Sequence, residues 1–333
     1  MTGLKKHLKI ILLGSLIALM SFLFLFFLIN QKVAFLSPLS SEKIKIDYTP
    51  YSFPNLKTRP YYPSEIAFEK ILKHEEKFTS YLFSFSVDGR RITGMANVPK
   101  GEGPWPVALL IRGWVDEEIY QTGLGTEKMA DFLAQNGFLT LAPDLIGYGG
   151  SDPAFPDMLQ TRFFQPITLI TLLDSLGNLP QADPEKVVLW GHSNGGQIAL
   201  SVLEITEKNI PTSLWAPVSA PFPESILHYT DELDDQGQLI KETLEEFEKE
   251  YSVSQYSIDS FYGQIQAPLI VHQGTQDESI PFAWTENLVK SLNDLNKEVV
   301  YYKYAGENHN FHYGSAPLAR ERDLAFFKKW LKL

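Results

Sequence analysis

Apolar and polar positions alternate along most of the chain in a way that predicts both strands and helices. From residue 106 onward, nearly continuous apolar runs are separated by segments whose apolar residues recur three and four positions apart. Runs of the first kind are typical of strands covered on both faces, and segments of the second kind are typical of helices. Predicted strands span 106–114, 138–142, 187–190, 213–216, 268–272 and 299–304, and predicted helices span 126–136, 163–176, 197–205, 282–292 and 318–331. This order is that of βαβ units and predicts a parallel sheet.

Residues 78–98 show a different, alternating pattern. Apolar side chains such as Phe83 and Phe85 precede the dipeptide Asp88-Gly89, and further alternating apolar positions follow it. A turn dipeptide between two alternating segments predicts a β-hairpin.

The N-terminal part of the chain differs from the rest in composition. Residues 10–30 contain no charged side chain and are long enough, at about 1.5 Å per residue, to form a transmembrane helix. Lysines concentrate before this segment, so we expect residues 1–9 to be cytoplasmic and the catalytic part to lie on the extracytoplasmic side of the cell membrane. A cleaved signal peptide, which would give a secreted protein, is the alternative. Residues 31–64 contain five prolines and several tyrosines, which predicts an extended tether to a domain spanning 65–333.

The regular alternation of strands and helices is interrupted at about residues 217–266. Within this stretch, residues 231–250 hold nine acidic and only two basic side chains, a large part of the chain's net charge of −11. We expect a small helical cap inserted into the domain. Its charge has two interpretations, either the solvated surface of the cap helices or a lid that favours cationic substrates.

Composition narrows the classes of function. A net charge of −11 argues against a nucleic-acid partner, because a phosphate-binding surface needs clustered Lys and Arg. The chain contains no cysteine, which excludes disulfides, thiolate metal sites and cysteine catalysis. It also lacks the H-E-x-x-H motif of zinc enzymes and the phosphate-binding loop motif, so we expect no metal and no cofactor.

A short motif, Gly191-His192-Ser193-Asn194-Gly195, follows directly on the apolar run 186–190 and leads into a predicted helix. A G-x-S-x-G motif between a strand and a helix is typical of a nucleophile elbow. Glycines on both sides of the serine let the strand and the helix approach closely. The alternative is an ordinary glycine-rich loop, which would need no partner residues elsewhere in the chain. We predict that Ser193 is a catalytic nucleophile.

A nucleophilic serine needs a base within hydrogen-bond reach and an acid that orients the base. Asp277 and His309 follow the last two predicted strands, in the chain order serine, acid, histidine that accompanies such an elbow. We predict His309 as the base and Asp277 as the acid. His312 remains an alternative base and Glu278 an alternative acid, because each lies close to the favoured residue in the sequence.

The negative charge that develops on the substrate needs backbone N–H donors already in place. We predict the amide of Asn194, which follows the nucleophile, and the amide of Trp114, which lies in the loop after the first core strand. The Trp114 side chain has a separate interpretation as a buried anchor for that loop. The side chain of His192 is expected to point away from the active face.

These motifs resemble those of the α/β-hydrolase superfamily, and in particular the prolyl oligopeptidase catalytic domain and the related dienelactone hydrolases and acetyl esterases. The likeness covers about residues 78–333 and rests on the motifs GHSNGG, GTQDESIP and GENHNF in that order. It implies an eight-stranded, mostly parallel sheet with helices on both faces, a catalytic triad of Ser193, Asp277 and His309, and no cofactor. The expected fold class is therefore an α/β-hydrolase fold with a small acidic helical cap and an N-terminal transmembrane helix.

Two features of the chain bear on its substrate. Prolyl oligopeptidases carry a large propeller before the hydrolase domain, and the residues before Phe78 are too few for one. Many relatives have His-Gly-Gly after the first core strand, whereas this chain has Arg112-Gly113-Trp114. We therefore expect a membrane-anchored serine hydrolase that cleaves an ester of a small or medium substrate through an acyl-enzyme intermediate. A peptidase acting on short peptides is the alternative, and a catalytically idle binding module is a further one.

Overall fold

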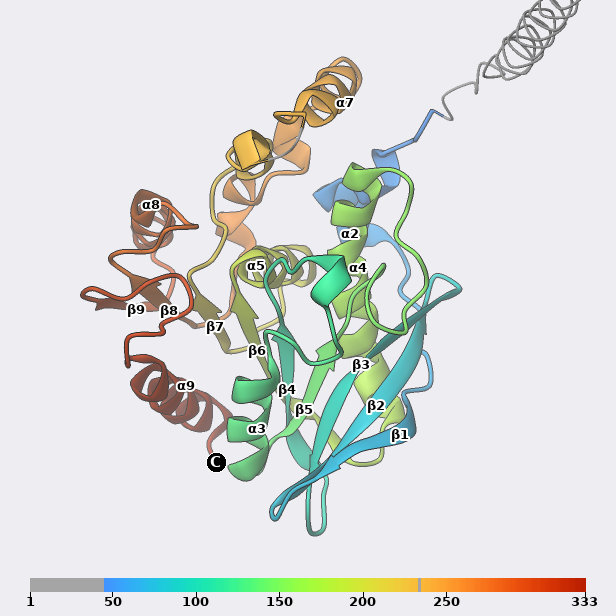
Figure 1. Cartoon of the computed structure of the whole chain (residues 1–333), viewed down its shortest axis with the longest axis vertical. Coiled ribbons are helices and arrows are strands. Elements are labelled where there is room, and N and C mark those ends of the chain that lie inside the picture. The colour runs from blue at the N-terminus through green and yellow to red at the C-terminus, as the bar shows by residue number, and fades with distance from the viewer. Residues whose placement is uncertain (1–44, 233–234) are drawn as a thin grey trace, which may run out of the picture. The chain divides into compact units, whose positions relative to one another are not determined.

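Nine strands form a single sheet in the computed structural model, which describes residues 45–232 and 235–333. Their order across the sheet is β1-β2-β3-β5-β4-β6-β7-β8-β9 (Figure 1). The pairs β1/β2, β2/β3 and β3/β5 are antiparallel, and the remaining pairs are parallel. The strands are β1 (Ala67–His74), β2 (Phe78–Val87), β3 (Arg90–Pro99), β4 (Trp105–Ile111), β5 (Leu139–Pro143), β6 (Ala182–His192), β7 (Thr212–Trp215), β8 (Leu269–Gly274) and β9 (Val299–Tyr304).

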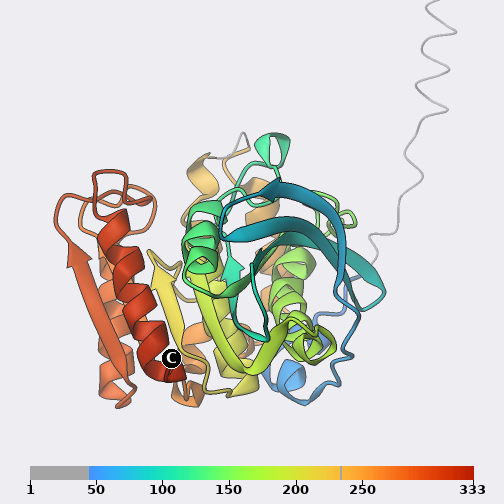
Figure 2. The same ribbon diagram turned by 90° about the horizontal axis from the view of Figure 1, so that it is seen from below.

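Helices cover both faces of the sheet (Figure 2). Neighbouring residues of β4 belong to two separate apolar cores, because successive side chains of a strand point to opposite faces. Val107 and Leu109 pack in the core that includes α4 and α5, and Ala108 and Leu110 pack in the core that includes α3 and α9.

The α-helices are α2 (Phe53–Thr58), α3 (Glu127–Gln135), α4 (Met158–Ser175), α5 (Asn194–Thr206), α6 (Glu224–Leu227), α7 (Gln238–Glu248), α8 (Phe282–Asp294) and α9 (Ala316–Leu331). Short 3-10 helices are η1 (Thr49–Tyr51), η2 (Glu117–Ile119), η3 (Leu176–Asn178), η4 (Thr230–Glu232), η5 (Val253–Gln255), η6 (Ile258–Ser260) and η7 (Tyr262–Gln264).

The expected sheet of eight strands is wrong by one, because β1 pairs with β2 as an additional edge strand. Most side chains of β1 are exposed or only partly buried, and two register shifts interrupt its pairing. A strand of this kind has no regular apolar alternation, so the pattern that predicts half-buried strands does not mark it. The hairpin predicted at 78–98 is present as β2 and β3.

The segment expected to be an extended tether up to residue 64 belongs to the domain from residue 47 onward. Its helix α2 buries Phe53 and Leu56 in the core beside α4 and α5. Pro54 is compatible with this helix because it occupies the first turn, where a backbone N–H has no helical partner. The prolines of this stretch therefore do not keep it extended.

The acidic insertion forms a set of short helices that includes α6 and α7, above the C-terminal ends of the parallel strands (Figure 1). Along α7, Leu244 and Phe247 are buried and the glutamates are exposed. An apolar stripe facing the domain with charges on the opposite side is the pattern of an amphipathic surface helix. The charge of α7 therefore matches the interpretation of a solvated helical surface.

The expected fold class also needs correction in its transmembrane helix. No helix formed by residues 45–232 or 235–333 is both long and apolar enough to cross a bilayer. The longest, α4, has 18 residues and buries its apolar side chains in the protein core. The segment 10–30, on which the prediction rested, lies outside the described residues. The described residues therefore contain no helix that fits the transmembrane part of the expected fold class.

Candidate active site

Ser193 occupies the sharp turn between β6 and α5. Its backbone has φ 56° and ψ −122°, in a region that residues other than glycine rarely adopt and that costs about 1–3 kcal/mol. The Ser193 amide donates to the Trp215 carbonyl at 2.9 Å, and the Ser193 carbonyl accepts from the amides of Gly196 and Val218 at 2.9 and 3.0 Å. These hydrogen bonds hold a strained turn at the C-terminal edge of the parallel strands.

Two glycines of the motif allow the close packing around this turn. A Cβ atom on Gly195 would lie 2.0 Å from the carbonyl oxygen of Ile111, and one on Gly191 would lie 2.4 Å from the carbonyl oxygen of Gly195. Such separations are far below van der Waals contact. The start of α5 therefore approaches β4 and β6 this closely only because both residues are glycine.

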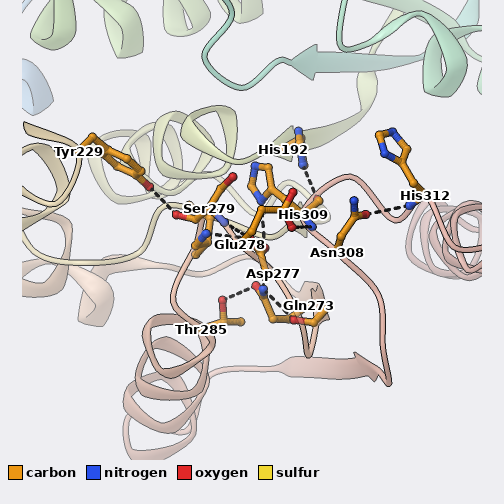
Figure 3. A network of polar contacts seen from close by, with 12 residues as sticks. His192, Tyr229, Gln273, Asp277, Glu278, Ser279, Thr285, Asn308, His309 and His312 are labelled. Carbon is orange, nitrogen blue, oxygen red and sulfur yellow. Dashed lines mark hydrogen bonds and ion pairs between the residues drawn. The ribbon is translucent and has the colours of Figure 1, made fainter. Parts of the chain in front are cut away.

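The predicted acid and base lie on neighbouring loops at the same edge of the sheet (Figure 3). Asp277 follows β8, and His309 follows β9. The Nδ1–H of His309 donates to Asp277 Oδ2 at 2.9 Å. The carboxylate also accepts from the Gln273 side chain at 2.8 Å and from the amides of Ser279 and Ile280 at 2.9 and 2.8 Å. These contacts fix the carboxylate, whose side chain has no exposed surface.

The hydrogen bonds to Asp277 also decide its charge. Burial on its own raises the pKa of this carboxyl group, but the hydrogen bond and charge of His309 and the two backbone amides outweigh burial, so the net pKa is lowered. The group is therefore a carboxylate at neutral pH. A carboxylate that accepts from Nδ1 keeps the proton on that nitrogen and leaves Nε2 of the neutral ring as the acceptor that a base needs.

The loop that carries His309 lies directly against the residue that precedes the serine. His192 Nε2–H donates to the His309 carbonyl at 3.1 Å, and the centres of the two imidazole rings are 4.6 Å apart. The expectation that His192 points away from the active face is therefore wrong. Burial lowers the pKa of His192 to about 4, so its ring is neutral at neutral pH.

Within the described residues, no hydrogen bond joins Ser193 Oγ to the His309 ring. Hydrogen bonds between catalytic groups are often long without substrate and tighten in the complex. The structure thus brings Asp277 and His309 together and places the His309 loop beside the nucleophile turn.

The two alternative residues occupy different positions. His312 is exposed and lies apart from the Asp277–His309 pair (Figure 3). Glu278 is also exposed, and its carboxylate accepts from the backbone amide of His309 at 3.2 Å rather than from the ring. The geometry therefore favours His309 over His312 as the base and Asp277 over Glu278 as the acid.

The loop after β4 lies against the serine side chain. A Cβ atom on Gly113 would lie 2.8 Å from Ser193 Cβ and 3.3 Å from Ser193 Oγ. On the other side of the serine, Asn194 is the first residue of α5, and the amides of a first helical turn have no acceptor within the helix. The loop after β4 and the start of α5 therefore both lie beside the serine.

Two hydrogen bonds fix the backbone around Trp114. Arg112 Nη1 donates to the Gly113 carbonyl at 2.8 Å, and Tyr148 Oη donates to the Val115 carbonyl at 2.9 Å. In a trans peptide the carbonyl and the following N–H point in opposite directions. Holding the Gly113 carbonyl on Arg112 therefore also fixes the direction of the Trp114 N–H. The Trp114 side chain is 75% exposed, so the interpretation of this residue as a buried anchor is wrong.

Arg112 is itself firmly held and almost fully buried, with 3% of its surface exposed. Its Nη2 donates to the Asp144 carbonyl at 2.9 Å. The guanidinium carbon lies 4.5 Å from the ring centre of Tyr120 and 3.9 Å from that of Tyr148, which are favourable cation–π contacts. A guanidinium held between two rings is a rigid support for the loop.

Sequence reasoning identified neither Arg112 nor Gln273 as part of the site. Both lie at the end of a core strand next to a predicted site residue, and this position is a signal that could have marked them. Gln273 is buried, and its side-chain oxygen accepts from Thr285 Oγ1 at 2.7 Å while its nitrogen donates to Asp277. Gln273 therefore connects α8 to the acid.

The arrangement provides a partly buried serine on a sharp turn and a histidine oriented by a carboxylate. In the part of the chain that the structure describes, no group of three or more His, Asp or Glu side chains is arranged to hold a metal ion.

Comparisons with known proteins place this geometry in context. A search of curated proteins found no match. Among solved structures, the chain is similar to an acetyl xylan esterase from Paenibacillus sp. R4, with 18% identity and a TM-score of 0.61 over 83% of this chain and 92% of the esterase. It is also similar to a puromycin-hydrolyzing peptidase from Mycobacterium tuberculosis, with 18% identity and a TM-score of 0.61 over 78% of this chain and 40% of the peptidase. Est1E from Butyrivibrio proteoclasticus matches with 16% identity and a TM-score of 0.54 over 76% of this chain and 99% of Est1E.

These identities are low, so the three structures show a shared fold only. A model of the prolyl oligopeptidase family matches residues 125–333, a span that contains Ser193, Asp277 and His309 and more than half of the chain. On this match, the chain belongs to the prolyl oligopeptidase family and is a serine hydrolase.

Proposed function

We propose that the protein hydrolyses a carboxylic ester of a small or medium substrate through an acyl-enzyme intermediate. The observation that carries this proposal is the buried Asp277–His309 pair, held against a strained turn that presents Ser193. The proposal assigns Ser193 as nucleophile, His309 as general base and acid, and Asp277 as the group that orients His309.

In the acylation step, His309 Nε2 accepts the proton of Ser193 Oγ as the oxygen attacks the ester carbonyl carbon. The C–O bond to the alcohol then breaks, and the alcohol leaves with the proton from His309. In the second step a water molecule attacks the acyl group, His309 accepts a proton from the water, and the acid leaves as Ser193 regains its proton. Asp277 remains a carboxylate throughout and stabilises the positive charge on His309.

Two backbone amides stabilise the oxyanion in this proposal. The Asn194 amide projects from the start of α5, and the Trp114 amide belongs to the peptide that Arg112 holds. One such donor typically contributes a factor of about 10²–10³ to the rate. Both donors belong to the backbone, so they act on any acyl group that fits between them.

Peptide hydrolysis is the second candidate because the matching family model is that of the prolyl oligopeptidases. Of two similar structures, one is named as an acetyl xylan esterase and the other as a puromycin-hydrolyzing peptidase, so ester and peptide hydrolysis both occur among proteins with this fold. We favour the ester because the residue after Gly113 in the loop after β4 is an exposed Trp114 rather than a residue with a polar side-chain donor.

A kinetic comparison of ester and amide substrates distinguishes ester hydrolysis from peptide hydrolysis. We would measure kcat/KM of the full chain for aryl esters of graded acyl length and for aryl amides of short proline-containing peptides. The proposal predicts turnover of esters with a burst of alcohol release before the steady state, and little turnover of the amides. A higher kcat/KM for the peptide amides would replace the esterase proposal with the peptidase. Absence of turnover on both sets would favour an idle binding module.

A further inference from the structure

Arg162 is a half-buried cation near the active site that has no carboxylate partner. It lies in the first part of α4, and none of the ion pairs within residues 45–232 and 235–333 includes it. Its Nη2 donates to Gln197 Oε1 at 2.5 Å and to Ser225 Oγ at 3.0 Å. A guanidinium carries five N–H donors in a planar fork, so most of its donors remain available to a ligand.

The position of Arg162 follows from its contacts with α5. Gln197 is the fourth residue after Ser193 in the sequence, which corresponds to about 6 Å along a helix axis. One turn further along α4, Gln165 Oε1 accepts from the Asn194 side chain at 3.3 Å. The face of α4 that carries Arg162 therefore contacts the first turn of α5, directly beside the nucleophile.

The cap completes this side of the site. Ser225 belongs to α6 and contacts Arg162, whereas Tyr229, just after α6, donates to the Ser279 carbonyl at 3.4 Å beside Asp277 (Figure 3). The cap segment around α6 thus connects α4 to the acid loop at the edge where Ser193 lies. Arg162 stands at the α4 end of this connection.

The surroundings of Arg162 favour an anionic ligand. Burial lowers the pKa of its guanidinium to about 10, so the group still carries its charge at neutral pH. Neutral amide and hydroxyl acceptors compensate only part of the cost of removing a cation from water. A carboxylate matches the guanidinium fork with two parallel hydrogen bonds and opposite charge.

The direction of the reaction assigns this site to the acyl part of the substrate. The leaving alcohol takes its proton from His309, so it departs on the side of the β8 and β9 loops. The acyl group then extends to the opposite side of Ser193. Helix α4 lies on that side, because it packs against β2, near the end of the sheet opposite to β8 and β9.

We infer that Arg162 binds a carboxylate at the far end of the acyl group, so that the substrates are monoesters of dicarboxylic acids. This inference rests on the proposed ester hydrolysis at Ser193. Gln197 and Ser225 hold the guanidinium in place, and the carboxylate occupies its remaining donors.

Matched substrates test the inference. We would compare kcat/KM for aryl monoesters of dicarboxylic acids of graded length with kcat/KM for the same esters bearing a terminal carboxamide. We expect the full chain to prefer the best carboxylate over its carboxamide by about tenfold or more, a typical effect of a charge-assisted pair. Arg162→Gln should abolish this preference while turnover of the carboxamide ester stays within about threefold, and Arg162→Lys should retain part of it.

Arg320→Gln is the matched control. Arg320 is also a partly buried arginine outside the ion pairs of the described residues, but it packs over Phe132 of α3 on the other face of the sheet. This variant should keep the full preference for the carboxylate. An unchanged preference in Arg162→Gln, or an equal loss in Arg320→Gln, would overturn the inference.

A binding measurement separates the inference from the proposed function. Glutarate is titrated into the Ser193→Ala variant by calorimetry, an experiment that requires no turnover. We expect glutarate to bind this variant and not to bind the Ser193→Ala/Arg162→Gln double variant. Arg162-dependent binding together with no ester turnover would retain the carboxylate site and overturn the hydrolysis proposal. Equal binding to both variants, or no binding to either, would overturn the carboxylate site even if esters are hydrolysed.

Discussion

Asp277 keeps its charge although its side chain is fully covered by protein. Its pKa is lowered because hydrogen bonds from His309 and two amides outweigh the effect of burial. An aspartate of this kind stabilises the folded state above the pKa of the unfolded chain, and the stabilisation is lost as the pH falls through the folded-state value. At neutral pH the carboxylate is therefore fully available to hold His309.

Replacing Asp277 with asparagine tests the hydrogen bond between His309 Nδ1 and Asp277 Oδ2. The amide can donate to Nδ1 and thereby hold the wrong tautomer, so we expect Asp277→Asn to lower kcat for an aryl ester by about 10³–10⁴ with the fold retained. Asp294→Asn, which alters an exposed carboxylate paired with Lys290 on α8, should leave kcat within about twofold. We expect Glu278→Gln to cost less than about tenfold, because Glu278 contacts only the His309 backbone amide. A larger loss in Glu278→Gln than in Asp277→Asn would reverse the assignment of the acid.

The loop between β4 and η2 is positioned by one side chain at its start and one from a later segment. Arg112 at its start and Tyr148 from a later loop hold the carbonyls of Gly113 and Val115, on either side of Trp114. The Trp114 amide has one direction only as long as those contacts persist. The direction of the Trp114 amide, the proposed oxyanion donor of this loop, therefore depends on the buried Arg112.

Arg112→Met tests this positioning role. The variant keeps an apolar chain between the two rings but loses the donor to Gly113, so we expect kcat to fall by up to about 10² with little change in KM. Arg112→Lys should recover part of kcat, because it restores one donor without the planar fork. Arg91→Met, which removes a surface ion pair with Glu69, serves as the control. A rise in KM with unchanged kcat would show that Arg112 affects substrate binding rather than the alignment of the loop.

The stability of the whole molecule is lowered at neutral pH by one of its buried acids, Glu204. Glu204 on α5 is fully buried, and within the described residues neither of its carboxylate oxygens has a hydrogen-bond partner. Burial, with a smaller contribution from the charge of Asp259, raises the pKa of Glu204 well above its ordinary value. The folded chain therefore binds this proton more tightly than the unfolded chain does, and stability falls as the pH rises above the unfolded-state pKa.

Glu204→Gln should remove that pH dependence. We expect its free energy of unfolding, measured with urea between about pH 5 and pH 9, to exceed that of the parent by a margin that grows by up to about 1.4 kcal/mol per pH unit. Glu248→Gln on the exposed face of α7 is the matched control and should follow the parent curve. Parallel curves for the parent and Glu204→Gln would contradict the assignment of a proton to this residue.

The regular core of the molecule was predictable from the sequence because it follows simple periodicities. Strands such as β4 and β8 are continuous apolar runs, and the loops after β6, β8 and β9 carry Ser193, Asp277 and His309 in a fixed order. The edge strand β1 was not predictable in this way, since an exposed and irregular strand has no periodic pattern. Helix α2 was missed because prolines outweighed the two apolar residues that pack it on the core.

The roles of Arg112 and Gln273, which hold the site in place, could not be predicted from sequence patterns either. Arg112 belongs to the loop that it holds, but Asp144, 32 positions further along the chain, and Tyr148 contact it from a later segment. Gln273 contacts Asp277 and Thr285 only because β8, its following loop and α8 converge. Contacts between distant segments depend on tertiary packing, which periodicity and motifs do not encode.

Covalent labelling can show directly whether Ser193 is the reactive nucleophile. A fluorophosphonate probe reacts covalently with a serine activated by a histidine, and mass spectrometry identifies the labelled peptide. We expect one label on the full chain, located at Ser193, no label on Ser193→Ala, and strongly slowed labelling of His309→Ala beside normal labelling of His312→Ala. Labelling of Ser193→Ala to the same extent as the parent, or a label located at another residue, would show that Ser193 is not the nucleophile.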